Sequence, residues 1–188
     1  MTLAPSFSLR VPTSDEHERR ICDHCGFVDY QNPKIVVGSV IRHEGMVLLC
    51  RRAIEPRSGF WTIPAGYMEL NETPEGGAAR EAFEEAGARI SISRLLAIYS
   101  VPRISQVQLI FRATLADPHL APGQETLELK LFPFADIPWD ELAFPSVHWA
   151  LRQDAEAEGG APPVPFNNPE GDAGDRLPSG EKLSDEDL

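Results

Sequence analysis

The sequence predicts an α/β fold in which helices pack against a β-sheet. β-Branched and apolar runs recur through the middle of the chain, between Lys34 and Phe132. A capped, alanine-rich helical segment lies between the third and fourth of these runs. A second amphipathic segment follows the last run. Strands interrupted by helices are typical of sandwiches in which helices cover a sheet, so an α/β or α+β sandwich is expected.

The expected strands follow one another along the chain. Residues 34–42 and 46–52 are joined by His43, Glu44 and Gly45, which predicts an antiparallel hairpin. Pro64 ends a short third strand that begins at Phe60. The remaining apolar runs predict a bent strand or a pair of strands over 89–101, and further strands over 106–115 and 128–132.

Two helices are expected. Thr73 is a typical N-cap residue, Pro74 suits the first helical position, and Gly87 ends the alanine-rich segment, so a helix is predicted over 73–86. A second helix is predicted over about 146–156, directly after Phe144 and Pro145.

Composition excludes several classes of function. The 188 residues carry a formal charge of −12, and no run approaches the roughly 20 apolar residues of a membrane span, so no membrane partner is expected. An acidic surface disfavours non-specific nucleic-acid binding, which requires cationic side chains. Three cysteines do not form a disulfide framework, which favours a reducing, cytoplasmic location. Anionic substrates are not excluded, because cations bound to carboxylates reverse the local charge.

The charge is distributed unevenly and indicates three regions. Residues 155–188 contain nine acidic and two basic residues, together with five prolines and five glycines. This composition buries little apolar surface, so residues 154–188 are predicted to form a disordered acidic extension. An N-terminal segment, 1–33, precedes the main domain, which is expected over 34–153.

Glu81, Glu84 and Glu85 form a cluster on the first predicted helix. Their spacing places the three carboxylates on one helix face, about one turn apart. Like charges at this spacing repel each other, so helix stability does not explain the cluster. Convergent carboxylates suit a hard divalent cation such as Mg²⁺, although a solvated acidic helix face is the alternative. Arg80 can bind a carboxylate through two N–H groups, and Glu72 is its candidate partner.

The spacing of the whole segment carries a stronger signal. It reads Gly-x5-Glu-x7-Arg-Glu-x2-Glu-Glu-x-Gly, with its fixed positions at Gly66, Glu72, Arg80, Glu81, Glu84, Glu85 and Gly87. This pattern resembles the signature of the Nudix hydrolase family, and the resemblance covers about residues 34–152. It implies an α/β/α sandwich with a mixed β-sheet and a loop–helix–loop catalytic box. Two positions where the family has aliphatic residues, 82 and 88, are alanine here.

The family resemblance implies hydrolysis of a nucleoside diphosphate linked to another moiety, with Mg²⁺ or Mn²⁺ as cofactor. It implies that Glu84 and Glu85 are metal ligands and that Glu81 is a ligand or the base that orients water. It also implies that the backbone carbonyl of Gly66 adds a ligand. Homodimers are frequent among similar proteins, so a second copy of the chain is an expected partner by analogy.

The remaining site residues are expected around this cluster. The resemblance implies that Arg80 and Glu72 hold the glutamates in place. Arg51 and Arg52 lie near the site in sequence and are candidates for contact with substrate phosphate, although a basic hairpin end is an equal alternative. Glu125 is a candidate to assist from another strand, and an edge-strand position without such a role is its alternative.

Cys22 and Cys25 form a CxxCG knuckle, which suits half of a tetrahedral Zn²⁺ site. The surrounding residues resemble the second half of the zinc ribbon that precedes one Nudix subgroup. The upstream stretch from Ser6 to Glu18 lacks the first cysteine pair of that ribbon. Two alternatives therefore stay open. In the first, the cysteines bind a zinc ion, which two protomers could share. In the second, they form a turn with reduced thiols and no metal.

The substrate prediction depends on a narrower resemblance. Residues 54–144 are similar to the Nudix subgroup of ADP-ribose and FAD pyrophosphatases, and Pro102 agrees with the spacing in ADP-ribose hydrolysers. The motif of NADH pyrophosphatases is not matched by residues 100–106. ADP-ribose or FAD is therefore the expected substrate, with NADH, a damaged nucleoside triphosphate or a capped RNA as alternatives. An alternative from another class is a nucleotide-sensing or interaction module that has lost turnover.

Overall fold

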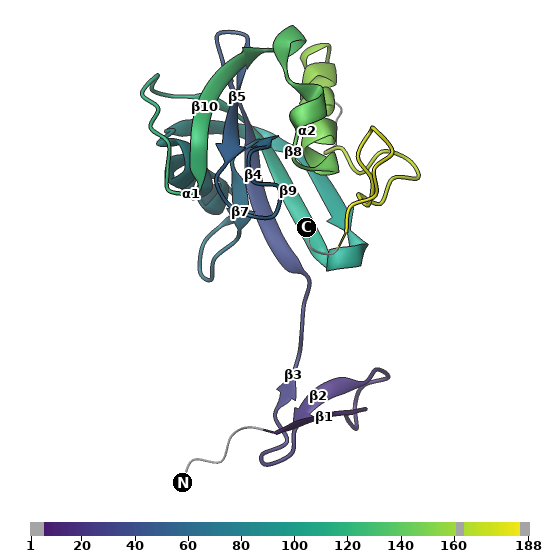
Figure 1. The fold of residues 1–188 in the computed structure, drawn as a ribbon. Helices are drawn as coiled ribbons and strands as arrows, with labels where there is room; N and C mark the ends of the chain where they lie inside the picture. Colours follow the sequence, from purple (N-terminus) through teal and green to yellow (C-terminus); the bar gives the residue numbers. More distant parts are fainter. Residues whose placement is uncertain (1–5, 161–163, 185–188) are drawn as a thin grey trace. The chain divides into compact units, whose positions relative to one another are not determined.

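A computed structural model describes residues 6–160 and 164–184, and the chain divides into two compact units, residues 1–33 and 34–188. The smaller unit is a three-stranded antiparallel sheet whose strands occur in sequence order: β1 (Phe7–Arg10), β2 (Arg19–Cys22) and β3 (Val28–Asp29) (Figure 1). The CxxCG knuckle forms the turn between β2 and β3, and its Gly26 N–H donates to the Cys22 carbonyl.

The larger unit is built on a seven-stranded mixed sheet with the main order β10-β5-β4-β9-β8. Its strands are β4 (Lys34–His43), β5 (Met46–Arg52), β6 (Trp61–Thr62), β7 (Ala65–Tyr67), β8 (Ile90–Val101), β9 (Gln106–Leu115) and β10 (Thr126–Pro133). The short strand β6 pairs with β5, and β7 pairs with β4. The β4–β9 pair is parallel, whereas the other pairs are antiparallel.

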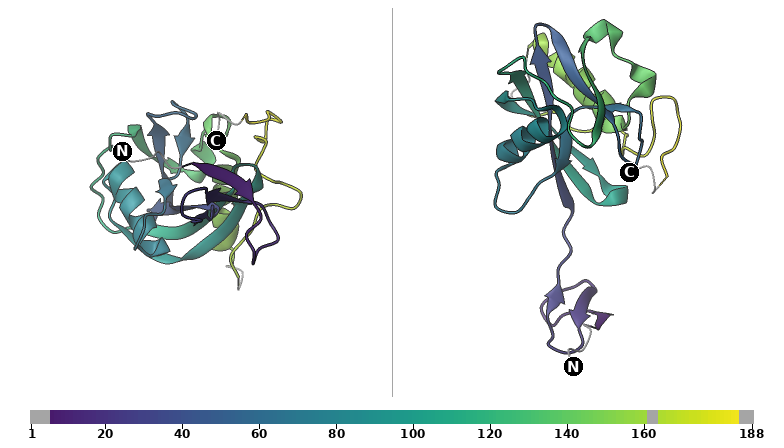
Figure 2. Two further views of the ribbon diagram at one scale, coloured as in Figure 1. Left: turned by 90° about the horizontal axis from the view of Figure 1, so that it is seen from below. Right: turned by 60° about the vertical axis from the view of Figure 1, so that its left-hand side comes forward.

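Two helices cover the two faces of this sheet (Figures 1 and 2). They are α1 (Pro74–Ala86) and α2 (Pro145–Glu158), and three short 3₁₀ turns complete the unit: η1 (Pro102–Ile104), η2 (Phe134–Asp136) and η3 (Trp139–Glu141). The predicted α/β sandwich with a mixed sheet is therefore confirmed. Among the described residues, no helix is both long and apolar enough to span a membrane.

The apolar runs of the central strands are explained by burial on both faces. Val40 on β4 packs in the cluster that includes Trp149 of α2, whereas its neighbour Ile41 packs in the cluster that includes Ala82 of α1. Successive side chains of a strand point to opposite faces, so a strand covered on both sides needs apolar residues throughout. Leu48 and Leu49 on β5 divide between the two clusters in the same way.

The local sequence signals act as expected. Glu44 and Gly45 have positive φ angles of 48° and 79° in the turn between β4 and β5, which suits a tight hairpin. Thr73 caps α1 by accepting a hydrogen bond from the Gly76 N–H at 3.1 Å. Gly87 ends this helix in the left-handed conformation, with φ of 63°. The predicted hairpin and the first helix are thus confirmed, and β8 is one strand with two register shifts.

A charged cluster fastens α2 to the sheet. The fully buried Asp154 of α2 pairs with Arg42 of β4 at 2.5 Å and with Arg112 of β9 at 2.9 Å. Glu158, one turn further along α2, contacts the same two arginines at 3.1 and 3.2 Å. Burial raises the pKa of Asp154, and the positive charge of Arg42 opposes this shift.

Part of the segment predicted to be disordered, 154–188, makes defined contacts in the structure. Helix α2 continues to Glu158, and residues 164–184 form hydrogen bonds with the rest of the larger unit. The Phe166 N–H donates to the Leu96 carbonyl, and the Ile98 N–H donates to the Phe166 carbonyl, both at 2.9 Å. Composition alone missed this order because the partner is the unpaired edge of β8, far away in sequence. Residues 161–163 and 185–188 of the predicted extension lie outside the described residues.

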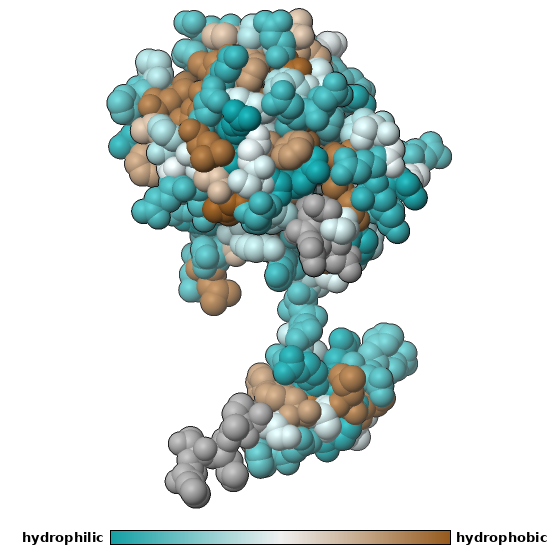
Figure 3. All heavy atoms as spheres, viewed as in Figure 1, coloured by the Kyte–Doolittle hydropathy of each residue, from teal (hydrophilic) through white to brown (hydrophobic). Residues whose placement is uncertain are grey.

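The visible surface of the larger unit mixes polar and apolar residues. Figure 3 shows its hydrophobic residues as separate brown patches among hydrophilic ones. Leu70, in the loop before α1, is the most exposed of the large hydrophobic side chains among the described residues, at 90%. Scattered exposed apolar residues of this kind are normal for soluble proteins and indicate no binding surface by themselves.

His148 on α2 predicts a pH dependence of stability. It is 4% exposed, and burial, with the nearby Arg152 charge as a second cause, lowers the pKa of its imidazole to about 4, while Asp140 opposes the shift. The unfolded state then binds more protons between pH 4 and 6.5, so the free energy of unfolding falls as the pH is lowered through this range, by up to about 1.4 kcal/mol per pH unit.

Replacing His148 with Gln is expected to remove this contribution. The measurement is urea-induced unfolding at several pH values between 4 and 7, with the exposed His119→Gln variant as the matched control. The unfolding free energy of the parent chain minus that of His148→Gln should decrease as the pH falls, because only the parent chain loses the contribution of His148. An unchanged difference across the range would show that His148 titrates normally.

Candidate active site

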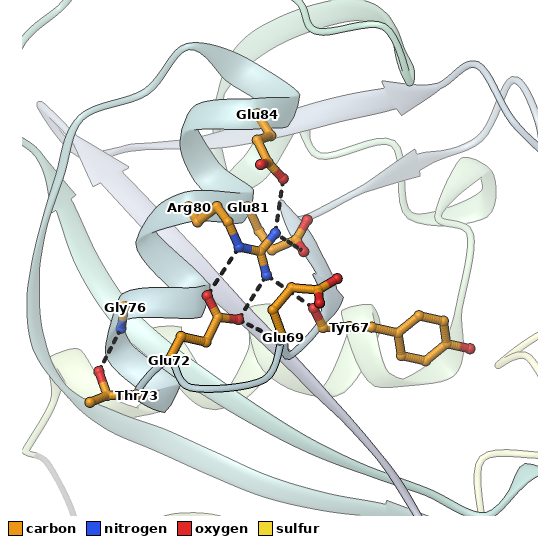
Figure 4. A network of polar contacts seen from close by, with 8 residues as sticks. All are labelled: Tyr67, Glu69, Glu72, Thr73, Gly76, Arg80, Glu81 and Glu84. Atoms are coloured by element: carbon orange, nitrogen blue, oxygen red, sulfur yellow. Dashed lines mark hydrogen bonds and ion pairs between the residues drawn. The ribbon is translucent and has the colours of Figure 1, made fainter.

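A loop–helix–loop segment builds the candidate site. The loop between β7 and α1 folds back on the helix, and Arg80 of α1 projects into the space between them (Figure 4). The Arg80 guanidinium donates to the Tyr67 carbonyl at 3.0 Å, which ties the helix to the end of β7. The same group contacts three of the glutamates singled out by the sequence pattern, namely Glu72, Glu81 and Glu84.

The Arg80–Glu72 pair is bidentate. Arg80 Nε donates to one Glu72 oxygen at 3.1 Å, and Nη2 donates to the other at 2.8 Å. The Glu69 N–H also donates to Glu72, at 2.6 Å, so this carboxylate holds both the helix and its leading loop. The Arg80 guanidinium, followed by the Glu69 N–H, lowers the pKa of Glu72 to about 2. Glu72 is therefore a permanently charged anchor for Arg80.

Glu81 lies deeper, at the contact between α1 and β7. Its side chain is 11% exposed and accepts a hydrogen bond from Arg80 Nη1 at 2.7 Å. Burial raises the pKa of Glu81, although the bond from Arg80 opposes the shift. Gly66 lies directly against this carboxylate, and a Cβ at position 66 would collide with both Glu81 oxygens. The glycine of the motif thus provides room for a carboxylate beside the backbone of β7.

Glu85 and Glu84 occupy different environments on the same helix face. Glu85 accepts a hydrogen bond from the Ala65 N–H at 3.3 Å, and burial, with the Glu81 charge as a second cause, raises its pKa to about 8. Glu84 is paired with Arg80 at 2.9 Å, but its side chain is 57% exposed. The helix face therefore carries one partly buried carboxylate, Glu85, and one exposed carboxylate, Glu84, in addition to the buried Glu81.

The donor set fits a hard divalent cation by its chemistry. The carboxylates of Glu81, Glu84 and Glu85 and the nearby carbonyl of Gly66 are oxygen donors, which Mg²⁺ and Mn²⁺ prefer. Gly66 leaves the Glu81 carboxylate room that any larger residue would fill. Within residues 6–160 and 164–184, no three acidic, histidine or cysteine side chains converge on one point as they stand. Instead, Arg80 lies between Glu81 and Glu84 and bonds to both (Figure 4).

A cavity of about 760 Å³ opens beside these carboxylates, large enough for a dinucleotide-sized ligand. One part is charged and is lined by residues of the carboxylate helix. The other part is formed by apolar side chains from several elements: Val36, Ile63, Val101, Ile104, Ile110, Phe144 and Val147. The described lining residues include six glutamates and two arginines. The cavity therefore presents excess negative charge next to an apolar surface.

The structure separates the three candidate substrate-binding residues. Arg52 and Glu125 line the cavity, and burial lowers the pKa of Arg52. Arg51 lies outside the lining; it donates to the Gly59 carbonyl at 2.8 Å and pairs with Glu128 at 3.6 Å. Neighbouring residues of a strand point to opposite sides, so both arginines of β5 could not face one cavity. The contact of Arg51 with substrate phosphate stays a prediction.

Two glutamines were missed by the sequence analysis. Gln106 and Gln108 of β9 both line the cavity, and the Gln108 amide donates to Gln106 at 3.3 Å. Their spacing of two residues on a strand places them on one face, which is the signal that would have found them. The parallel pairing of β9 with β4 decides which face of β9 lines the cavity. In this pairing, Gln106 lies opposite Lys34.

The smaller unit keeps its cysteines as thiols. Cys22 is buried and Cys25 is exposed. Backbone N–H groups of Cys25 and His24 lower the pKa of the Cys22 thiol. Within the described residues, no third or fourth side chain joins this pair to complete a metal site.

Comparison with known proteins identifies the family. The NUDIX domain family matches residues 32–152, and the Nudix N-terminal family, a zinc ribbon, matches residues 4–31. The chain belongs to the Nudix hydrolase family. A solved NUDIX hydrolase from Nitrosomonas europaea is 46% identical and has a TM-score of 0.83, covering 88% of this chain and 95% of that one. The predicted family and enzyme class are confirmed by these matches.

Relatives in the family carry different substrate names. An ADP-ribose pyrophosphatase of Methanocaldococcus jannaschii is 29% identical over 119 residues, which is 61% of this chain and 69% of that protein. A MutT-like protein of Streptomyces ambofaciens is 43% identical over 77 residues, or 41% of this chain and 48% of that protein. An NAD-capped RNA hydrolase NudC of Salmonella typhi is 31% identical over 121 residues, 63% of this chain and 46% of that one. The chain thus spans about half the length of the latter two relatives.

Proposed function

We propose that this Nudix hydrolase cleaves the diphosphate bond of a nucleoside diphosphate joined to a second group, with ADP-ribose or FAD as substrate. ADP-ribose would give AMP and ribose 5-phosphate, and FAD would give AMP and FMN. The excess of glutamate over arginine in the cavity carries this proposal. The glutamates by themselves would repel a diphosphate, but divalent cations bound to them would reverse the local charge and attract it. Mg²⁺ or Mn²⁺ bound by Glu84, Glu85 and the Gly66 carbonyl would neutralise the diphosphate and acidify a bound water.

The protein's own groups divide the remaining tasks. Arg80, anchored by Glu72 and the Tyr67 carbonyl, holds the helix face against the end of β7. Glu81 is fixed by Arg80 and is the candidate for orienting water or binding metal. Arg52 also lines the cavity and is a cation that can contact a phosphate. A planar base or sugar would occupy the apolar part.

The substrate choice rests on the similarity to the Methanocaldococcus ADP-ribose pyrophosphatase and on the size of the cavity. NADH and capped RNA form the second candidate class, favoured by the NudC relatives. The three free thiols support residence in a reducing compartment, which we propose to be the cytoplasm.

A substrate panel tests this proposal. ADP-ribose, FAD, NADH and nucleoside triphosphates are incubated with the full chain and Mg²⁺, and release of a phosphomonoester is measured with and without a metal chelator. ADP-ribose or FAD should have the highest kcat/KM, and the chelator should abolish turnover. Faster hydrolysis of NADH or a triphosphate, or turnover unaffected by the chelator, would contradict the proposal. Tight binding of a nucleotide with no hydrolysis would favour the sensing module.

A further inference from the structure

Residues 164–184, which we call the C-terminal strap, extend the edge of the main sheet. The backbone of Phe166 pairs with β8 through the two hydrogen bonds to Leu96 and Ile98. The Asn168 side chain then brackets Ser100: its Oδ1 accepts from the Ser100 N–H at 2.9 Å, and its Nδ2 donates to the Ser100 carbonyl at 2.8 Å. A side-chain amide that satisfies both backbone groups of one residue acts as a specific latch on an edge strand.

The strap next turns towards the cavity. Trp149 Nε1 of α2 donates to Asp172 Oδ2 at 3.2 Å, and Asp172 Oδ1 accepts from the Gly174 N–H at 3.0 Å. Gly174, with φ of 78°, lines the same cavity as the carboxylates, next to Val101. A Cβ at position 174 would lie 3.3 Å from the Trp149 ring, so the strap packs closely at this point. The cavity is therefore lined in part by residues beyond the catalytic box and the sheet.

The end of the strap forms a small hairpin. The Leu183 N–H donates to the Asp175 carbonyl, and the Leu177 N–H donates to the Glu181 carbonyl. The side chains of Leu177 and Leu183 are buried, with 8% and 2% exposure. Apolar burial and cross-strand bonds together give this acidic segment a defined shape.

The hairpin contacts two segments whose neighbouring residues line the cavity. Glu181 pairs at 3.7 Å with Arg57, whose loop places Ile54, Glu55 and Pro56 in the cavity lining. The Ser184 carbonyl accepts from Arg103 at 3.3 Å, and Arg103 lies in η1 beside the lining residue Ile104. Arg57 is also stacked on Phe60, 3.8 Å from the ring centroid, which holds its side chain in place. The strap thus spans from the β8–η1 side to the loop between β5 and β6.

We propose that the C-terminal strap is a wall of the active site that limits the size of the group attached to the nucleoside diphosphate. This inference rests on the proposed function, because it assumes that the cavity holds such a ligand. A small group such as ribose 5-phosphate fits inside about 760 Å³. A polynucleotide chain attached at the same place exceeds this volume and must extend out of the cavity, part of whose lining is Gly174 of the strap. The strap therefore selects small diphosphate-linked compounds over capped RNA.

Variants that release the strap test the inference. Asn168→Ala removes the latch on Ser100, and Glu181→Gln removes the charge that meets Arg57; the double variant combines both. A chain that ends at residue 160 lacks the strap entirely. Glu170→Gln is the matched control, because Glu170 is an exposed carboxylate on the same segment. Circular dichroism and thermal unfolding identify the variants that keep the fold.

Two quantities are compared for ADP-ribose and for a short RNA with a 5′-terminal NAD cap: kcat/KM with Mg²⁺ and, where no hydrolysis occurs, the dissociation constant with Mg²⁺. In the double variant, the preference for ADP-ribose over the RNA should fall by about tenfold through a gain on the RNA, a typical size for a steric contribution to specificity. Glu170→Gln should keep the parent preference.

An unchanged preference in the folded double variant would overturn the inference, as would a parent chain that accepts both ligands equally. If the shortened chain fails to fold, the double variant decides. If neither of these compounds nor FAD is hydrolysed, the proposed function fails, while the ratio of dissociation constants still tests the wall. A ratio that drops in the double variant supports the wall, and a constant ratio rejects it.

Discussion

Glu85→Gln is expected to lower kcat by at least about a hundredfold to a thousandfold, the range seen when a key electrostatic group of an active site is removed. The amide has nearly the same shape as the carboxylate, and its oxygen can still accept the hydrogen bond from the Ala65 N–H. It carries no charge, however, and is a poor ligand for Mg²⁺. Activity should therefore be lost while the local geometry is kept.

The stability of this variant provides a second readout. Glu85 is a partly buried acid whose pKa is raised to about 8, so its charged form is poorly accommodated in the fold. The neutral amide should leave the thermal unfolding midpoint of the metal-free protein unchanged or higher. Steady-state kinetics with Mg²⁺ and thermal unfolding with a chelator are the measurements.

Glu75→Gln is the matched control for the Glu85 substitution, because Glu75 is an exposed glutamate in the first turn of the same helix. It should retain parent turnover. Glu84→Gln should lose activity as Glu85→Gln does, since both are assigned to the metal. Near-normal rates for both Glu84→Gln and Glu85→Gln would show that the site is placed wrongly on α1.

The largest loss of stability is expected from Asp154→Ala. This change removes the carboxylate shared by Arg42 and Arg112 and leaves two guanidinium groups at the interface between α2 and the sheet. Breaking a buried ion pair by removing one partner typically costs about 3–5 kcal/mol, a large part of the free energy of unfolding of a domain. The lower end is expected here, because the Arg112 side chain is 21% exposed and can reach water.

Denaturant unfolding measures this loss, and Glu158→Gln is its control. Glu158 contacts the same two arginines, but its side chain is 53% exposed, so its pairs are screened by solvent and should contribute less than about 1 kcal/mol. A cost for Asp154→Ala no larger than that of Glu158→Gln would mean that the buried cluster contributes nothing specific to the packing of α2.

Much of the site could be predicted because its parts lie close together in the chain. Thr73, Pro74 and Gly87 mark the two ends of α1 by local backbone chemistry. Once the helix is placed, the spacing of Glu81, Glu84 and Glu85 puts their carboxylates on one face without any tertiary information. The bidentate Arg80–Glu72 pair was also predictable, since Glu72 lies directly before the helix cap and Arg80 follows eight residues later on the helix.

Other features depend on contacts between distant segments. The choice between Arg51 and Arg52 is set by the register of β5, which alternation alone leaves undetermined. Gln106 and Gln108 reach the cavity because β9 pairs in parallel with β4, a long-range pairing that carries no local signal. The order of residues 164–184 arises from the free edge of β8, whereas their composition resembles that of a disordered chain.

The sequence by itself determined the class of fold, the capped helix and the identity of the carboxylates, because these follow from periodicity and nearest-neighbour geometry. Only the tertiary structure decided which of these carboxylates is buried, which arginine of β5 lines the cavity, and which distant segments contribute to its lining. The exposure of a side chain depends on which segments pack around it, and these segments are far apart in the sequence. Glu84 and Glu85 illustrate the difference: they are neighbours in sequence, but the packing of α1 against the sheet leaves one exposed and raises the pKa of the other to about 8.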